Sequence, residues 1–378
     1  MKILFLIQTL SLRGGAENAL INLVLNLKDK GHEAQIIFLQ QPNDFIHSLQ
    51  KAGIKAHSVN LKSRLNFFSG FIRITRIIRD EKPDILNAIN FIPMLYLAIT
   101  KVISSRVVRI VSYHNMGYEA YPANTNYRKI RKYFDIFCNQ FMDGHTGVSQ
   151  AVANSYKNHL MLKEIQTINN IIPVERILAS FSSSREIANK KNSLHKIIMA
   201  GRLVPEKGYD FMISAMRLLV DRGLKVKLEI HGDGLLKDEL NEQIAACNLN
   251  NHIFIHATVS HSQLFQKIFL SDILVLSSIS EGLPMAAAEA MVIGTPVIAT
   301  KVGGLPEMIQ NNVSGILVEP KDSIALADAI EVVLGDKELQ DKLSSGGRSR
   351  ISEKYSAEKV SDDLLNYFRK LLHRKGVS

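Results

Sequence analysis

The sequence predicts an α/β protein with two doubly wound domains in tandem, each a parallel sheet covered by helices. Short apolar runs alternate with helix-period segments along the whole chain, as is typical of βα units. The two halves also begin alike, because residues 2–27 and 196–219 each pass through an apolar run, a glycine-bearing loop and an amphipathic segment. With 378 residues, 46% of them hydrophobic, the chain is long enough to bury a core in each domain.

The apolar runs define the expected strands. In the first half these are residues 2–7, 34–39, 84–88, 107–113, 145–148 and 166–168, and in the second half 196–200, 226–230, 252–255, 272–276 and 296–299. Residues 173–193 are polar and lack a period, which is typical of a linker. We therefore expect Rossmann-like domains at residues 1–172 and 194–355. Residues 356–378 carry apolar side chains at helical spacing, which predicts an amphipathic helix packed on a domain.

Charge and cysteine content limit the functional classes. The whole net charge of +10 lies in residues 1–172, and residues 173–378 are balanced. Such an imbalance favours an anionic partner for the first half, although charge that serves only solubility remains the alternative. Cys138 and Cys247, the two cysteines, have no metal-ligand spacing and suit a reducing cytoplasm. The apolar residues 91–100 are too few to span a bilayer, and we interpret residues 1–10 as a buried strand rather than a signal peptide.

The strongest motif lies in residues 271–307. An apolar run ends at Ser277, a loop carries Glu281, and Pro284 is placed to begin a helix that contains Glu289. The free N–H groups and the dipole at a helix N-terminus favour a phosphate. Two carboxylates beside it could accept hydrogen bonds from sugar or ribose hydroxyls. The sequence therefore predicts a site for a phosphorylated sugar compound.

Several motifs occur together in the order found in one known family. They are GRLVPEKG at 201–208, HGDG at 231–234, the Glu281 and Glu289 pair, and GTPVIATKVGGLPE at 294–307, with looser matches GGAE at 14–17, HN at 114–115 and VS at 148–149. In these motifs the sequence resembles family 4 of the retaining glycosyltransferases. The resemblance implies the GT-B fold, in which two Rossmann-like domains face a central cleft and the C-terminal helix crosses back to the N-terminal domain.

The resemblance also implies roles for particular residues. Arg202 and Lys207 match the basic pair on the donor diphosphate, where two cations would stabilise the leaving group without a metal or cofactor. Glu281 matches the carboxylate that reaches hydroxyls of the transferred sugar, and Glu289 the one that holds the donor ribose. The remaining donor-side matches are the backbone N–H groups of Gly282, Leu283 and Met285, the close-approach loop of Gly14 and Gly15, and His114, which would face the transferred sugar.

Two segments of the first half combine basic and aromatic residues. Residues 64–79 and 127–134 both predict basic amphipathic helices. Such helices can lie on an anionic membrane with their aromatic side chains toward the lipid. Alternatively, each buries its apolar stripe in the domain core and extends its arginines into water. The sequence leaves both interpretations open.

The expected activity is transfer of a hexosyl group from a nucleotide diphosphate sugar, with UDP-sugars favoured, to an acceptor hydroxyl. The acceptor is expected to be a lipid-linked, surface-polysaccharide or lipopolysaccharide precursor at the cytoplasmic face of the membrane. A sugar-nucleotide epimerase and a non-catalytic nucleotide-sugar-binding protein remain alternatives. A dinucleotide oxidoreductase is disfavoured because HGDGLLK has Lys237 where G-x-G-x-x-G needs its third glycine. Charge alone suggests nucleic acid, and we expect no such partner.

Overall fold

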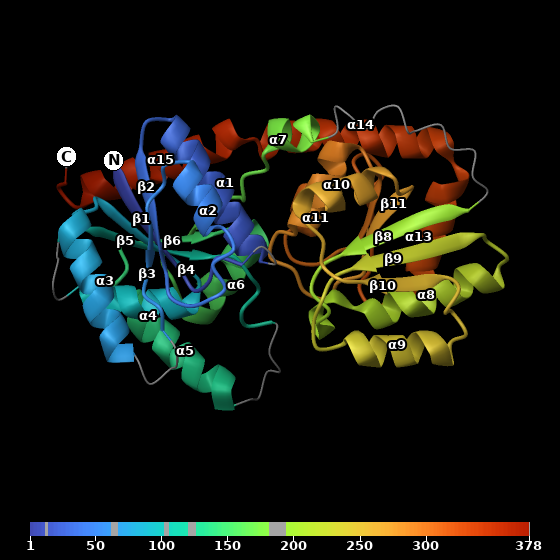
Figure 1. Ribbon diagram of the computed structural model, residues 1–378, viewed down its shortest axis with the longest axis horizontal. Coiled ribbons are helices and arrows are strands. Elements are labelled where there is room, and N and C mark those ends of the chain that lie inside the picture. The colour runs from blue at the N-terminus through green and yellow to red at the C-terminus, as the bar shows by residue number, and fades with distance from the viewer. Residues whose placement is uncertain (12–13, 62–66, 102–105, 120–125, 181–193, 378) are drawn as a thin grey trace. The chain divides into compact units, whose positions relative to one another are not determined.

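The computed structural model describes residues 1–11, 14–61, 67–101, 106–119, 126–180 and 194–377 (Figure 1). The chain divides into two compact units, which are Met1–Ile171 with Ala357–Ser378, and Ile172–Ser356. Each unit holds its own parallel sheet with helices on both faces, which confirms the predicted α/β class.

The first unit is built on a seven-stranded sheet in the order β3-β2-β1-β4-β5-β6-β7. Its strands are β1 Lys2–Ile7, β2 Glu33–Phe38, β3 Ala56–Ser58, β4 Ile85–Ile89, β5 Val108–Tyr113, β6 Gly144–Gly147 and β7 Gln166–Thr167. Its helices are α1 Gly15–Asp29, α2 Ile46–Lys51, α3 Phe67–Glu81, α4 Phe91–Thr100, α5 Asn126–Asn139, α6 Gln150–Leu160 and α15 Ala357–Arg374. In Figure 1, α1 and α15 lie on one side of this sheet, and α3, α4 and α5 lie on the other.

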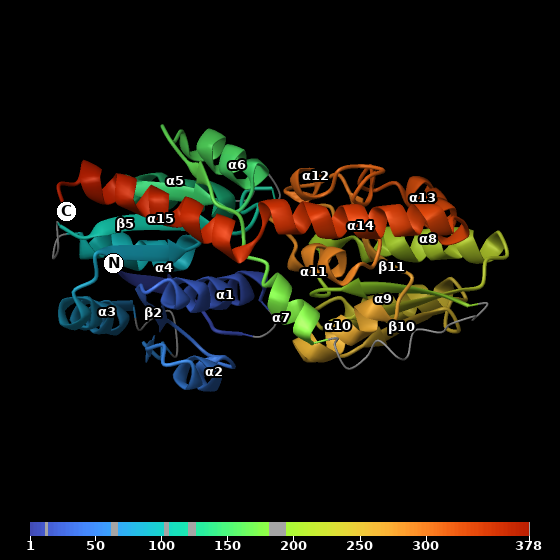
Figure 2. The same cartoon turned by 90° about the horizontal axis from the view of Figure 1, so that it is seen from above.

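The C-terminal helix α15 completes the core of the first unit. It lies alongside α1 (Figure 2) and buries its apolar face against residues of β1, β2 and α1. The buried side chains of α15 are Val360, Leu364, Leu365, Tyr367, Phe368, Leu371 and Leu372. The helical spacing of these residues in the sequence is thus explained by one packed face.

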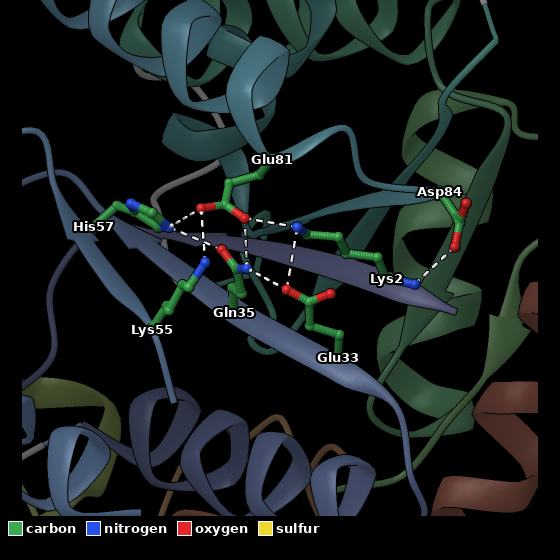
Figure 3. A network of polar contacts seen from close by, with 7 residues as sticks. All are labelled: Lys2, Glu33, Gln35, Lys55, His57, Glu81 and Asp84. Atoms are coloured by element: carbon green, nitrogen blue, oxygen red, sulfur yellow. Dashed lines mark hydrogen bonds and ion pairs between the residues drawn. The ribbon is translucent and has the colours of Figure 1, made fainter. Parts of the chain in front are cut away.

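Charged side chains close the amino edge of the first sheet (Figure 3). The Lys2 ammonium lies 2.7 Å from the Glu81 carboxylate and 3.1 Å from that of Glu33. Gln35 donates a hydrogen bond of 2.7 Å to Glu81, and its oxygen lies 2.8 Å from the His57 ring. The bond from Lys2 holds the pKa of Glu81 down at about 2. This network ties α3 to three strands at the edge opposite to the one where ligands bind in such sheets.

The second unit has a six-stranded sheet in the order β10-β9-β8-β11-β12-β13. The strands are β8 His195–Ala200, β9 Val226–His231, β10 Ile253–His256, β11 Ile273–Leu276, β12 Val297–Thr300 and β13 Ile316–Val318. The helices are α7 Val174–Ala179, α8 Tyr209–Asp221, α9 Lys237–Ala246, α10 His261–Phe269, α11 Met285–Ile293, α12 Leu305–Met308, α13 Ser323–Gly335 and α14 Lys337–Lys354, with the 3-10 turn η3 Pro205–Lys207.

The structure differs from the expected elements at three short segments. The edge strands β3 and β13 have three residues each and were not predicted, because so short a run carries no alternation that marks a strand. The predicted linker 173–193 begins with the helix α7, whose Ile177 is buried and which packs on α11. Residues 181–193 of that linker lie outside the described residues.

Candidate functional site

The donor-side residues predicted from the sequence follow β8 and β11, two neighbouring strands of the second sheet. The chain leaves β8 in one direction across the sheet toward β9, and the strands after β11 continue in the other. Parallel sheets bind ligands at such a reversal, beyond the carboxyl ends of the strands. The loops that carry Arg202, Lys207 and Glu281 therefore begin at the expected place.

Lys207 and Glu281 form an ion pair at this edge. The Lys207 Nζ atom lies 2.6 Å from Glu281 Oε1, and the Ser278 hydroxyl donates to the same oxygen at 2.7 Å. The side chains of Lys207 and Glu281 are only 18% and 9% exposed. Lys207 follows β8 and Glu281 follows β11, so they are far apart in the sequence. The fold thus holds a cation and a carboxylate within reach of one ligand.

The backbone around this pair is fixed by contacts that the sequence did not reveal. The Ser277 hydroxyl lies 3.1 Å from the carbonyl oxygen of Lys207 and 2.8 Å from that of Gly208. Gly208 has a φ of +59°, and a Cβ there would lie 2.3 Å from the Ser277 carbonyl oxygen. The signal for this residue was its place in the GRLVPEKG motif, whereas nothing in the sequence marks Ser277 as its partner.

Gly303 supports the Glu281 loop from the other side. Its φ is +53°, and a Cβ at Gly303 would lie 1.7 Å from the Glu281 carbonyl oxygen. The next residue, Gly304, donates its N–H to the Gly282 carbonyl at 2.9 Å. The two glycines of GTPVIATKVGGLPE therefore serve close approach of two backbones.

Arg202 occupies the loop between β8 and η3. Its carbonyl oxygen accepts a hydrogen bond of 3.2 Å from the Tyr209 hydroxyl, which also lies 3.2 Å from the Gly201 carbonyl. Its side chain is exposed. The loop backbone is thus anchored to α8, while the guanidinium can reach a ligand at the edge.

Helix α11 carries Glu289 in its second turn. Pro284 was predicted as the first helical residue, but it has extended backbone and is the N-cap, so that the helix begins at Met285. Gly282 and Leu283 are buried in the loop that leads to it. Glu289 is 5% exposed, and burial raises its pKa to about 7. The His261 ring lies beside its carboxylate, with Nδ1 3.8 Å from Oε1.

The other predicted residues belong to the first unit. Gly14 is the N-cap of α1 and Gly15 its first residue, directly beyond β1 and residues 12–13, which lie outside the described residues. His114 follows β5, and its backbone N–H donates to Asn90 Oδ1 at 2.9 Å. Burial lowers the pKa of His114 to about 4, so the ring is neutral at pH 7. Its Nδ1 atom has no hydrogen-bond partner among the described residues.

A pocket that the sequence did not predict lies beside His114 in the first unit. It is bounded by α1, α15 and the carboxyl ends of β4, β5 and β6. Within its wall, Thr146 donates to the Ser112 hydroxyl at 2.7 Å, and Ser112 donates to Asn87 Oδ1 at 2.9 Å. Polar side chains inside apolar strands were the only sequence signal for this pocket.

Helix α5 turns four large apolar side chains toward solvent. Ile130, Tyr133, Phe134 and Phe137 are 55–76% exposed, whereas the fully buried Asp135 lies on the opposite side of the helix. Asp135 accepts a hydrogen bond from the Tyr118 hydroxyl and lies 3.5 Å from Arg131 Nε. The polar face of α5 is therefore the one packed on the protein.

Helix α3 buries one part of its apolar side chains and exposes another. Its Ile74 and Ile78 are buried, but Phe68 is 79% and Ile72 59% exposed. Residues 64–66 of the predicted basic segment lie outside the described residues. Among the described residues, no helix is both long enough and apolar enough to cross a membrane.

Two family models cover most of the chain. The model described as Glycosyltransferase Family 4 matches residues 13–176, and the one described as Glycosyl transferases group 1 matches residues 180–350. The fold agrees with these matches. An Anabaena protein, Alr3699/HepE, solved with UDP and glucose, superposes with a TM-score of 0.81 over 98% of this chain and 100% of its own, at 21% identity. The chain belongs to the family 4 glycosyltransferases, enzymes of the GT-B fold.

Two curated relatives illustrate the range of similarity. The Streptomyces kanamyceticus α-D-kanosaminyltransferase is 30% identical over 175 residues, which are 46% of this chain and 45% of that protein. The chain thus spans about half the length of this relative. A Campylobacter jejuni protein is 28% identical over 93% of this chain and 94% of its own; it is named GalNAc-α-(1→4)-GalNAc-α-(1→3)-diNAcBac-PP-undecaprenol α-1,4-N-acetyl-D-galactosaminyltransferase.

Proposed function

We propose that this glycosyltransferase moves a sugar, with retention of anomeric configuration, from a nucleotide diphosphate sugar to a hydroxyl of a lipid-linked or surface-glycan precursor. The observation that carries the proposal is the pair of Lys207 and Glu281 at the reversal point of the second sheet. It combines a cation suited to a diphosphate with a carboxylate suited to sugar hydroxyls.

The proposed mechanism relies on positioning and charge rather than on a protein nucleophile. Lys207 and Arg202 would neutralise the diphosphate as the glycosidic bond breaks, so the transfer step would need no metal. Glu281 would accept hydrogen bonds from hydroxyls of the transferred sugar. In the structure Lys207 and Glu281 neutralise each other and are already held in place by Ser277 and Ser278. Donor binding would exchange this ion pair for contacts to phosphate and sugar.

The donor nucleotide is proposed to be UDP. The Anabaena neighbour has been solved with UDP and with UDP-glucose, which supports a UDP-sugar on a related fold. Glu289 would hold the ribose hydroxyls of this nucleotide. Burial raises the pKa of its carboxyl group, and hydrogen bonds from two ribose hydroxyls would favour the charged form.

The acceptor is proposed to be presented at a membrane surface. Exposed aromatic and aliphatic side chains on α5 accompany Lys129 and Lys132, and the first half carries the whole positive excess. Apolar insertion combined with basic charge is the pattern by which peripheral helices bind anionic lipid. The undecaprenol-linked name of the Campylobacter relative supports an acceptor of this kind.

The donor proposal is tested by incubating purified protein with UDP-sugars and measuring sugar release or transfer. Lys207→Ala and Glu281→Gln should each lower kcat about 100-fold or more, because each removes a charge-assisted contact in the transition state. Lys301→Ala, which removes another ion-paired lysine of the same unit, should leave kcat unchanged. Wild-type turnover in both site variants would refute the assignment, and epimerised donor without transfer would identify an epimerase.

The membrane proposal is tested by sedimentation with anionic liposomes at low salt. Phe134→Ser together with Phe137→Ser should weaken binding about tenfold or more, because two exposed apolar side chains leave the lipid interface. Leu235→Ser, at a side chain that is 95% exposed in the second unit, is the matched control and should bind like wild type. Equal sedimentation of all three proteins, or none by wild type, would contradict a membrane-binding α5.

A further inference from the structure

Three side chains that can ligate a metal meet on the edge of the second sheet. Glu229 and His231 lie two residues apart in β9, so their side chains point to the same face. His256 of β10 is the direct cross-strand partner of His231 and points to that face too. One candidate ligand atom from each residue lies within 4.8 Å of the other two.

The histidine rings of this cluster carry unsatisfied nitrogens. His231 is 4% exposed, and both of its ring nitrogens lack a hydrogen-bond partner among the described residues, as does Nε2 of His256. The nearest carboxylate oxygen, Glu229 Oε2, lies 3.5 Å from His231 Nε2. The two rings stack with centroids 4.8 Å apart. His231 Nδ1 and His256 Nε2 have no such neighbour, and buried polar atoms without partners are costly, so the pair calls for a ligand.

We propose that Glu229, His231 and His256 bind one divalent transition-metal ion of the Zn²⁺ class. Two imidazoles and one carboxylate are a known protein ligand set for zinc. Tetrahedral ligands about 2.1 Å from the ion lie about 3.4 Å apart, so small side-chain rotations would bring the three ligand atoms together. The fourth position would be left for water or a small molecule.

The charges that face the cluster permit this occupancy. Lys227 pairs with Glu229 Oε1 at 3.1 Å, which leaves Oε2 on the side of His231. The positive charge of Lys267 in α10 would oppose a bound cation, because it contributes to lowering the pKa of both His231 and Glu229. His231 is only 4% exposed, and a neutral imidazole ring offers its lone pair to a metal ion. An ion bound by three ligands would have to overcome the repulsion from Lys267.

A bound ion would also restrain the loop that carries Arg202. The His231 carbonyl oxygen accepts the N–H of Gly201 at 3.1 Å, and Gly232 donates its N–H to the His256 carbonyl at 3.1 Å. A Cβ at Gly232 would lie 1.9 Å from the Gly201 carbonyl oxygen, so the backbones are in close contact. The proposed metal takes no part in the proposed sugar transfer, although the HGDG turn connects the metal site to the loop that carries Arg202.

The proposal is tested by titrating Zn²⁺ into chelator-treated, full-length protein and following binding by calorimetry and the melting temperature. Wild type should bind one equivalent at this cluster and melt at a higher temperature. His256→Gln and Glu229→Gln should each weaken that binding about tenfold or more. The matched control is His195→Gln, which removes a partly exposed histidine at the start of β8 and should bind like wild type.

A second probe distinguishes a built site from loose binding to surface histidines. Co²⁺ should give the intense visible absorption of tetrahedral coordination in wild type and in His195→Gln, and this band should be lost in His256→Gln. Circular dichroism of His256→Gln should match wild type, which separates loss of a ligand from loss of the fold. Equal Zn²⁺ affinity in wild type and both cluster variants, or no saturable binding by wild type, would overturn the proposal.

Discussion

Glu289 illustrates how a buried carboxyl group makes stability depend on pH. It is 5% exposed in α11, where burial raises its pKa from 4.5 to about 7. The folded protein therefore holds a proton on this residue at pH values where the unfolded chain has released it. The contribution of Glu289 to stability is greatest below about pH 4.5, falls as the pH rises toward 7, and stays low above that.

Replacement of Glu289 by glutamine should remove this pH dependence. Between pH 5 and pH 8 the unfolding free energy of Glu289→Gln, relative to wild type, should rise by about 2 kcal/mol, because only the wild-type residue must ionise in a buried place. Urea denaturation at both pH values measures the difference. Glu242→Gln, at an exposed position of α9, serves as a control and should show no such change. A constant difference between wild type and Glu289→Gln would contradict a protonated Glu289.

At the residue scale, the sequence identified candidate ligand-binding side chains but not the residues that hold them in place. Glu281 and Lys207 were predicted from their motifs, and the structure brings them into contact. Ser278 and the Gly303 contact depend on which loops meet in space, which no local pattern records. For the same reason the cluster of His231 and His256 was missed, since its members join only through strand pairing.

At the scale of the element, the turn after β12 fixes the position of the Glu281 loop. Gly303 lies in the left-handed region, and its α-carbon faces the Glu281 carbonyl so closely that no side chain fits. The loop and the turn must therefore shift together if either changes.

Gly303→Ala should destabilise the protein by about 2 kcal/mol or more, because it combines a strained φ with a backbone clash. Its kcat should fall as well, since Glu281 would be displaced. Chemical denaturation and the transfer assay measure the two effects. Gly335→Ala is the matched control, because a Cβ there meets nothing within 4 Å and the residue ends a helix. Similar stability for both variants would show that the Gly303 turn is not tightly constrained.

For helix α5, the sequence predicted the type of element but not its orientation. Its alternation of basic and apolar residues predicted an amphipathic helix but not which face is buried. Which face of α5 is buried depends on hydrogen bonds between its polar side chains, Asp135 and Asn139, and tyrosines of the domain. Asp135 bonds with Tyr118, and Asn139 accepts from Tyr113 at 2.9 Å. Burial is the main cause that raises the pKa of Asp135 to about 6.

For the whole molecule, the two ends of the chain share one core. Residues of β1 and α1 pack against α15, so the first unit is complete only when the last helix is present. The repeated βα pattern predicted both sheets, because long apolar strands are readable from sequence. The strands β3 and β13 and the helix α7 were not predicted, since their formation depends on neighbours already in place.

Phe368→Ala should lower the unfolding free energy by about 3–4 kcal/mol, because Phe368 is fully buried in the core of the first unit. Denaturant titration measures the loss. Arg369→Ala, at an exposed neighbour on the same helix, should change stability by less than about 0.5 kcal/mol. If Phe368→Ala were as stable as wild type, α15 could not be an integral part of that core.

We propose that the edge of the second sheet binds a nucleotide diphosphate sugar. Calorimetric titration of UDP and UDP-glucose, with GDP and ADP as comparisons, tests it most directly. We expect saturable binding of UDP by wild type and by Lys301→Ala, and a loss of about tenfold or more in affinity for Lys207→Ala. Failure of wild type to bind any nucleotide, or equal UDP affinity in wild type and Lys207→Ala, would contradict the account.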